Sequence, residues 1–297
     1  MLDEYVSTDL ASECRDMHGT GQIPGVRFSQ SQSAGVTISR IEIRESKAAK
    51  QMGKPMGTYV TLTFGAPHFL DGDAEDVLCG LLAENLKQML YAASPQVKTV
   101  LVAGLGNRRI TADAVGPLTV DRILVTRHLE SVDLDLFCRV GQLSVAALAP
   151  GVLGDTGVEA AEIVKQMART VSADVVIAVD ALAARHVDRL GCTVQLADSG
   201  IEPGSGVGNR RMALSLQTIG CPVIAVGVPT VVNSATLVRD ALEAVGVATP
   251  DAALKKALDN KKSFFVTLKE SDASVDAMAR ILARSLDMAL VAEEAEV

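Results

Sequence analysis

The middle of the chain alternates between short apolar runs and segments with the apolar spacing of a helix. The apolar runs begin the segments 99–107, 144–151, 174–185, 193–200 and 222–230, and helical spacing follows in 113–129, 158–171 and 234–245. Strands that alternate with helices form βαβ units. Aromatic residues are 3% of the chain and Trp is absent, so Ala, Val, Leu and Ile must fill the core. The pattern predicts an α/β fold with a mainly parallel sheet flanked by helices.

Other elements flank this central part. Residues 36–46 and 58–64 are rich in Val, Ile and Thr and predict strands, the first with a phase slip that suggests a bulge or break. Leu recurs every four residues in 73–92, which predicts a helix, and 274–291 predicts an amphipathic one. The polar residues 1–34 predict a loosely held arm. With no repeat and no Pro/Ser-rich linker, we expect one domain with an N-terminal β-rich annex.

Charge and cysteine usage narrow the function classes. The formal net charge is −8, which is unfavourable for direct binding of nucleic acid. Five Cys at irregular spacings, without a CxxC, favour a reducing compartment and argue against a zinc site. The N-terminus is acidic and lacks the apolar stretch of a secretory signal, and no apolar run is long enough for a membrane span. We therefore expect a cytoplasmic protein that uses no membrane.

An Asp stands at or after the end of four predicted strands. These are Asp113, Asp155, Asp180 and Asp198. In open α/β sheets ligands gather at the carboxyl ends of the strands, so parallel neighbours would bring these side chains to one edge. Carboxyl groups held close together cannot all ionise, and a pair can then act as general acid and general base. The same cluster could instead bind a divalent cation.

Simpler roles are open for each of these residues. A single Asp after a strand is more often a helix cap or turn residue than a catalytic group. Asp180 is the hardest to explain in that way, because it ends a nearly uninterrupted apolar run, after which we expect a short helix over 181–185. Glycine-rich loops follow two strands, GLGN at 104–107 and GSGVGNR at 204–210, the second with Gly206 and Gly208. They fit tight turns, phosphate binding, or backbone N–H groups that support an oxyanion.

Several long segments resemble the germination proteases, or spore proteases, of endospore-forming bacteria. They are VAGLGNRRITADAVGPLTVDRILVTRHL (102–129), ALAPGVLGDTGVEAAEIV (147–164), DVVIAVDALAAR (174–185), QLADSGIEPGSGVGNRR (195–211) and PVIAVGVPTVVNSATLV (222–238). A weaker similarity covers STDLASE (7–13) and YVTL (59–62). The resemblance is dense over about 99–240.

This resemblance implies an endopeptidase that degrades small acid-soluble spore proteins during germination, in the forespore or spore core. It implies a fold similar to hydrogenase-maturation peptidases, a homotetramer, and an inactive precursor that removes its own propeptide. The two aspartates proposed as catalytic in the family correspond to Asp113 in TADAVGP and Asp180 in AVDALAAR. The resemblance does not assign which of them is the acid, and it implies no cofactor or metal.

The resemblance also gives the N-terminus a role. Substrates of the family carry a Thr-Glu-apolar-Ala-Ser-Glu motif that is cut after the acidic residue, and this chain has Thr-Asp-Leu-Ala-Ser-Glu at 8–13. We therefore expect self-cleavage between Asp9 and Leu10. Residues 1–9 would be the propeptide and 10–297 a single peptidase domain, with Asp155, Asp198, Gly206 and Gly208 as possible supporting residues.

Three alternatives remain open at this stage. The same carboxylates could be ligands in a metal-dependent endopeptidase. The loops GLGN and GSGVGN could belong to a nucleotide-binding module. The Gly and Asp residues could also serve only turns and caps in a scaffold without catalytic activity.

Overall fold

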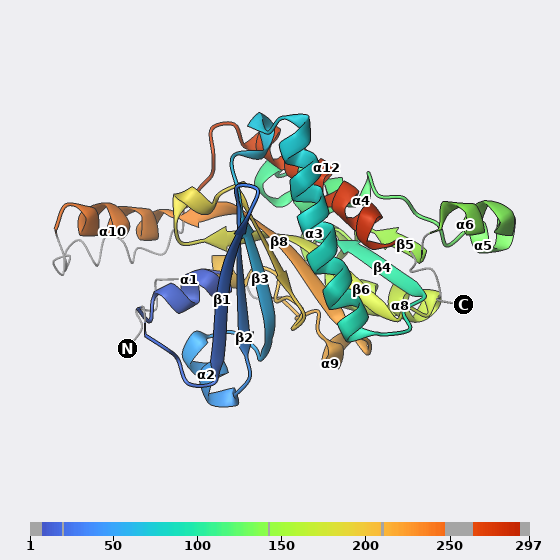
Figure 1. Ribbon diagram of the computed structural model, residues 1–297, viewed down its shortest axis with the longest axis horizontal. Helices are drawn as coiled ribbons and strands as arrows, with labels where there is room; N and C mark the ends of the chain where they lie inside the picture. Colours follow the sequence, from blue (N-terminus) through green and yellow to red (C-terminus); the bar gives the residue numbers. More distant parts are fainter. Residues whose placement is uncertain (1–7, 20, 142, 209–210, 247–263, 292–297) are drawn as a thin grey trace.

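The computed structural model describes residues 8–19, 21–141, 143–208, 211–246 and 264–291. Within them the strands form one mixed sheet of nine, in the order β1-β2-β3-β7-β8-β6-β4-β5, with β9 beside β8. Helices lie on both faces (Figure 1). Helix α10 projects at one end of the molecule, and α5 and α6 project at the other (Figure 1). The predicted α/β fold is confirmed.

The element bounds are as follows. The strands are β1 Val26–Ser33, β2 Val36–Ile43, β3 Gly57–Thr63, β4 Thr99–Gly104, β5 Ser144–Leu148, β6 Val175–Ala184, β7 Thr193–Ala197, β8 Val223–Asn233 and β9 Phe265–Val266. The helices are α1 Ala11–Asp16, α2 Ser46–Met52, α3 Gly72–Ala93, α4 Val115–Val120, α5 Leu129–Val132, α6 Leu134–Val140, α7 Leu153–Thr156, α8 Ala160–Val171, α9 Leu216–Ile219, α10 Ser234–Ala244 and α12 Ser271–Ala289. Two 3₁₀ turns matter for the site, η2 Thr111–Asp113 and η4 Ser205–Val207.

Strand direction divides the sheet into two parts. Strands β5, β4, β6 and β8 are parallel neighbours, as the alternation of strands and helices predicts. Strand β7 runs antiparallel to β8, and β3, β2 and β1 continue the sheet in antiparallel pairs. The expected N-terminal annex is therefore an extension of the same sheet. Strand β2 pairs without a break along its whole length, so the bulge expected from its sequence is wrong.

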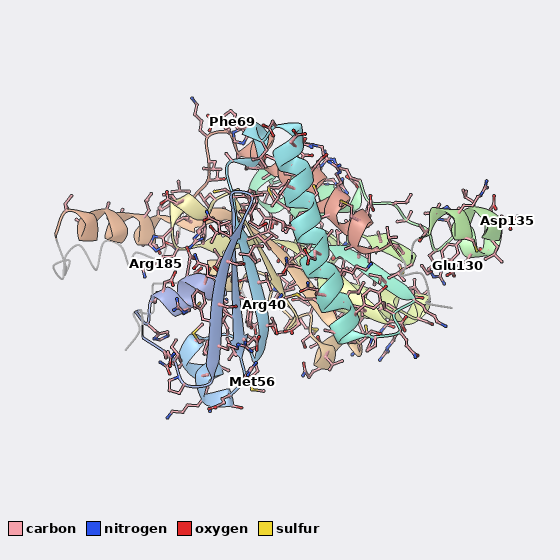
Figure 2. All side chains as sticks on the ribbon, in the orientation of Figure 1. Arg40, Met56, Phe69, Glu130, Asp135 and Arg185 are labelled. Atoms are coloured by element: carbon pink, nitrogen blue, oxygen red, sulfur yellow. The ribbon has the colours of Figure 1, made fainter. Side chains whose placement is uncertain are left out.

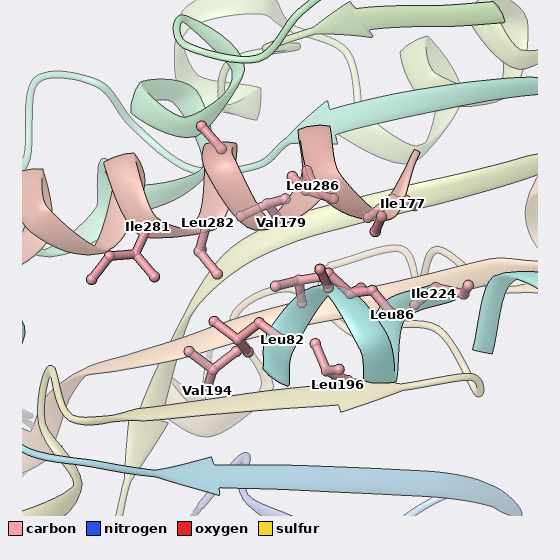
Figure 3. Packing of buried hydrophobic residues seen from close by; sticks show 14 of the residues in the cluster. Leu82, Leu86, Ile177, Val179, Val194, Leu196, Ile224, Ile281, Leu282 and Leu286 are labelled. Carbon is pink, nitrogen blue, oxygen red and sulfur yellow. The ribbon is translucent and has the colours of Figure 1, made fainter. Parts of the chain in front are cut away.

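The largest core cluster lies between one face of the sheet and the helices α3 and α12. Alternate residues of the central strands point to this face, among them Ile177 and Val179 of β6 and Ile224 of β8. Figure 3 shows them packed against Leu82 and Leu86 of α3 and Leu282 of α12. The leucine spacing of 73–92 that predicts α3 is the stripe that becomes buried.

Two separate groups of helices cover the opposite face. Helices α8 and α9 pack over β4 and β6 at one side, and α1 and α2 pack over β2, β3 and β7 at the other. The middle of this face, over β6 and β8, is covered by the side chain of Leu10 at the start of α1. The N-terminal segment therefore lies against the sheet, and the expectation of a loosely held arm is wrong for Leu10 and α1.

Two further helix predictions differ from the structure. The helix expected over 113–129 is limited to α4, because the backbone N–H groups of Thr126 and Arg127 donate to Val145 in β5 and hold that stretch non-helical. The short helix expected after Asp180 is replaced by strand. Strand β6 continues to Ala184 because residues 180–184 keep pairing with β8.

Candidate active site

Asp113 and Asp180 lie at the same edge of the sheet, at the carboxyl end of β4, beyond which β6 continues to Ala184. Asp180 is in β6, one residue beyond Val179, which is the last residue of β6 that pairs with β4. Asp113 ends η2, which follows β4 and packs against β6 and β8. The backbone N–H of Leu105 donates to the carbonyl of Val179 and ties the two strand ends together at 2.8 Å. This is the arrangement expected from parallel neighbours.

Asp180 is a buried carboxyl group that receives few hydrogen bonds in place of water. Its side chain is 5% exposed, and one oxygen accepts a hydrogen bond of 2.9 Å from the backbone N–H of Ala181. Burial raises its pKa well above the usual range, and the negative charge of Asp113 raises it further. Asp9 adds a smaller rise. Asp180 is therefore suited to hold a proton at neutral pH.

Asp113 is half-buried and is held by its own loop. One carboxyl oxygen accepts from the backbone N–H of Asn107 at 2.8 Å, and Gly106, at φ +110°, lets the loop turn so closely that a Cβ there would meet the Asp113 carbonyl at 2.1 Å. Burial raises the pKa of Asp113, and the Asn107 hydrogen bond opposes that rise. The two carboxyl groups thus interact across the edge with unequal environments, which suits an acid–base pair.

The other two strand-end aspartates have different surroundings. Asp155 lies in α7 with its side chain exposed, 3.8 Å from Arg109. Asp198 lies at the opposite edge of the sheet, because β7 runs antiparallel to β8. There its carboxylate accepts a 2.7 Å hydrogen bond from the backbone N–H of Thr58 and joins β7 to β3. The structure therefore separates Asp198 from Asp113 and Asp180.

The N-terminal segment 8–13 lies along the free edge of β6 beyond β4. The backbone N–H of Asp9 donates to the carbonyl of Ala183 at 2.8 Å, and the backbone N–H of Ala183 donates to the Asp9 carboxylate at 2.9 Å. The Ser205 hydroxyl donates to the other Asp9 oxygen at 2.7 Å. Asp9 is thus hydrogen-bonded through its backbone N–H and through both carboxylate oxygens.

Leu10 and Glu13 anchor the segment on the other side of the Asp9–Leu10 bond. Leu10 is fully buried among apolar side chains that include Leu182, Leu190 and Val232. Glu13 is 2% exposed, and its carboxylate accepts from the backbone N–H groups of Arg185 at 2.8 Å and His186 at 3.0 Å. Arg185 is labelled in Figure 2 beside α1.

Thr8 closes the segment on itself. Its hydroxyl donates to the Glu13 carboxylate and accepts from the backbone N–H of Leu10 at 3.1 Å. The side chains of Thr8, Asp9, Leu10 and Glu13 all have defined contacts, so the segment is bound as a folded turn that leads into α1.

The second glycine-rich loop contacts this segment. A Cβ on Gly206 would meet an Asp9 carboxylate oxygen at 2.2 Å, so Gly206 allows η4 to approach Asp9 closely. Gly208, at φ +72°, ends the turn with open space around it. The glycine-rich loop at 204–210, which the sequence analysis singles out, therefore contacts the segment 8–13 at the Asp9 side chain.

A pocket of about 750 Å³ opens beside Asp9. Thr8, Asp9, Leu182, Ser205 and Gly227 contribute to its wall. Gln195 of β7 also lines it, and its side-chain amide contacts the segment on both sides of Leu10. Sequence reasoning missed Gln195. The available signal was a polar residue between Val194 and Leu196 in a short, mostly apolar strand.

Among the described residues, no group of three or more His, Cys, Asp or Glu side chains is arranged to hold a metal ion. None of their helices combines the length and apolarity that crossing a membrane requires.

Comparisons with known proteins were made on sequence and on structure. The family model described as germination protease matches residues 6–247. A germination protease of Caldanaerobacter subterraneus subsp. tengcongensis is 38% identical over 96% of this chain and 94% of its own length. One from Clostridium perfringens is 36% identical over 96% of this chain and 95% of its own length, and one from Priestia megaterium is 39% identical over 82% and 68%.

Among solved structures, a NiFe hydrogenase maturation protease of Thermococcus kodakarensis is similar, with a TM-score of 0.36 and 16% identity. The similarity covers 66% of this chain and 97% of that one. The match to the family model and the extent of the sequence identity show that this chain belongs to the germination protease family.

Proposed function

We propose that this protein is a spore-germination endopeptidase in which Asp113 and Asp180 hydrolyse the peptide bond. Membership of the germination protease family supports the peptidase activity. The observation that carries the aspartate assignment is the interaction of two half-buried or buried carboxyl groups at one sheet edge, both with raised pKa. An ionised carboxylate removes a proton from water, and the resulting hydroxide attacks the carbonyl carbon. The protonated partner donates to the leaving nitrogen as the C–N bond breaks.

The same proposal includes self-processing at the Asp9–Leu10 bond. The seated segment supports it, since Asp9 and Leu10 are held on either side of that bond and the charge of Asp9 is felt by Asp180. Because the segment lies against the sheet of its own chain, the first-order rate of cleavage should not change with protein concentration. The products would be residues 1–9 and a chain that begins at Leu10.

The substrates we propose are small acid-soluble spore proteins that carry the Thr-Glu-apolar-Ala-Ser-Glu motif. Contacts of residues 8–13 support this, because a sequence related to the motif is held through Thr8, Leu10 and Glu13. We further propose a homotetramer in the cytoplasm of the forespore, which analytical ultracentrifugation and fractionation of sporulating cells would test.

The decisive experiment compares three Asp→Asn variants of the full chain. Asp113→Asn and Asp180→Asn should each slow cleavage of the Asp9–Leu10 bond by about 10³-fold or more, because general acid or base catalysis is lost. Asp198→Asn is the matched control, since Asp198 lies at the opposite edge, and it should cleave at the wild-type rate. Intact-mass spectrometry over time measures the rate.

If either Asp113→Asn or Asp180→Asn cleaves the Asp9–Leu10 bond at the wild-type rate, the aspartate mechanism is overturned. The metal-dependent alternative makes a different prediction for the wild type. Dialysis against a chelator would abolish its activity, and one particular divalent metal would restore it.

A further inference from the structure

Gln195 and Asp180 project from the same face of the sheet, on either side of Gly227. Asp180 of β6 and Gln195 of β7 are both direct cross-strand partners of Gly227 in β8. Cross-strand partners point to the same face of a sheet. The strand between them carries no side chain at this position, and the Leu182 side chain lies over it, where a Cβ on Gly227 would meet it at 2.3 Å. Gln195 therefore faces the seated segment from the side opposite β6.

The Gln195 amide bridges the two sides of Leu10. Its Nε2 donates to the carbonyl oxygen of Asp9 at 3.0 Å, and its Oε1 accepts from the backbone N–H of Ala11 at 2.7 Å. The orientation of the amide follows from its partners, because a backbone N–H can only donate and a carbonyl can only accept. Gln195 is 6% exposed; its contact with the Ala11 N–H is buried, and its contact with the Asp9 carbonyl is part-buried beside the pocket.

The carbonyl that Gln195 contacts belongs to the bond proposed for cleavage. Attack by water on that carbon places negative charge on the Asp9 oxygen. A neutral donor that already points at this oxygen, in a part-buried position, stabilises the charge as it develops. At the other end of the same bond, the Leu10 N–H is held by the Thr8 hydroxyl. The peptide bond is thus fixed at its oxygen and at its nitrogen.

We propose that Gln195 is a catalytic residue, the oxyanion donor for the Asp9–Leu10 bond and for the equivalent bond of substrates. The inference rests on the proposed endopeptidase function and adds a role that neither aspartate fills. A competing explanation is that Gln195 only seats the segment through Ala11. The two explanations differ in which atom of the amide matters, Nε2 or Oε1.

Two variants of the full chain separate those atoms. Gln195→Glu keeps an oxygen that accepts from the Ala11 N–H, and once the Glu is ionised it has no donor for the Asp9 carbonyl. Because this position is buried and next to Asp9, ionisation of the Glu requires a pH above neutral. Gln195→Met removes both contacts at similar volume. Gln217→Glu is the matched control, because Gln217 is exposed on the wall of the same pocket and undergoes the same change of charge. Circular dichroism checks that each variant folds.

Two quantities are measured from neutral pH to about pH 9, so that the range includes the pH at which the buried Glu ionises. Intact-mass spectrometry gives the rate of Asp9–Leu10 cleavage, and hydrogen exchange of residues 9–13 in freshly purified chain gives the fraction of segment that is seated. After division by the seated fraction, the cleavage rate of Gln195→Glu should be about 10²–10³-fold below wild type. Gln195→Met should show a similar normalised loss and faster exchange, and Gln217→Glu should match wild type in both.

The outcomes separate this inference from the proposed function. If the normalised cleavage rate of Gln195→Glu equals that of the wild type, the oxyanion role is overturned. The proposed function still stands in that case, provided that the wild type cleaves itself and Asp180→Asn does not. If the wild-type chain does not cleave itself or a spore protein with the substrate motif, the proposed function and this inference both fail.

Discussion

Glu13 and Asp180 are both buried carboxyl groups, but the two regions that hold them treat the charge in opposite ways. Glu13, in the N-terminal segment, is 2% exposed and accepts from two backbone N–H groups and from the Thr8 hydroxyl. Asp180, at the end of the parallel strands, is 5% exposed and accepts one backbone hydrogen bond, from Ala181. Similar burial therefore comes with very different numbers of donors.

This contrast separates recognition from chemistry. A carboxylate that receives several hydrogen bonds gives the segment that carries it a fixed position. A carboxyl group that is desolvated and has a negative neighbour favours its protonated form, which is what a general acid requires. Under the proposed mechanism, the segment 8–13 would supply binding, and the edge with Asp113 and Asp180 would supply reactivity.

Among the variants that test this contrast, Glu13→Gln should have the largest effect, which is a weaker binding of the segment 8–13 to the sheet. The amide keeps one oxygen acceptor, and its NH₂ group faces a backbone N–H of Arg185 or His186, so one of the part-buried hydrogen bonds that Glu13 accepts is lost. The cost should be about 2–3 kcal/mol, or roughly 30–150-fold in the seating equilibrium of the segment. Hydrogen exchange of residues 9–13 measures it, with the exposed Glu202→Gln as control. Exchange that stays at the wild-type rate would show that Glu13 does not anchor the segment.

The convergence of Asp113 and Asp180 could be predicted from the sequence because parallel strands place their ends at one edge. The same reasoning fails for Asp198, because the direction of β7 is set by its pairing with β8 and β3. Nothing in the five residues of β7 encodes that direction. Its Asp looks like the others in sequence and serves as a link to Thr58 in the structure.

The seating of the N-terminal segment also lay beyond the sequence pattern. Residues 8–13 are mostly polar and small, which predicts a loose arm when they are considered alone. Their partners are Ala183, Arg185 and Gln195, more than 170 positions away along the chain. Two of those partners contribute backbone N–H groups, which no residue type reveals. The family resemblance marked the segment as a cleavage site, and the contacts that hold it required the structure.

A second test measures the free energy of unfolding. Most substitutions of buried residues lower it, whereas Asp180→Asn should raise it. The folded-state pKa of Asp180 is raised, so the wild type loses stability as pH rises from the unfolded-state pKa towards the folded-state value, and stays lower above it. Asn keeps the oxygen that accepts from Ala181 and has no charge to desolvate. At pH 7 the variant should therefore be more stable than the wild type, because it has no carboxyl group that must keep a proton or lose solvation in the folded state.

Urea unfolding of freshly purified, unprocessed chain at several pH values measures this difference. The gain should shrink towards pH 4, as the carboxyl group of the unfolded wild type also becomes protonated. Asp198→Asn is the control, because its carboxylate is exposed and hydrogen-bonded, and it should show no such gain at pH 7. Equal stability of Asp180→Asn and wild type across this range would mean that the carboxyl group is not desolvated as the structure indicates.

The smallest effect should come from Ser205→Ala, which removes a hydrogen-bond donor from the Asp9 carboxylate. Asp9 would then accept a single backbone hydrogen bond, as Asp180 does. Asp9 would keep the N–H of Ala183 and lose the Ser205 hydroxyl. A hydrogen bond to a charged group is worth about 1.5–3 kcal/mol when buried, and partial exposure of Asp9 and Ser205 places the loss at or below about 1.5 kcal/mol. Cleavage at Asp9–Leu10 should then slow by up to about 10-fold.

The control is Ser199→Ala, because Ser199 lines the same pocket and donates to the Tyr59 hydroxyl. The wild-type preference for Asp at position 9 should also weaken in Ser205→Ala, since the hydroxyl contacts the carboxylate and nothing else in the segment. Comparison with Asp9→Asn tests this point, because an amide in place of the carboxylate removes the charge that Ser205 satisfies. If Ser205→Ala slows the wild-type chain and the Asp9→Asn chain by the same factor, the hydroxyl does not read the charge, and selection of an acidic residue must come from the Ala183 N–H alone.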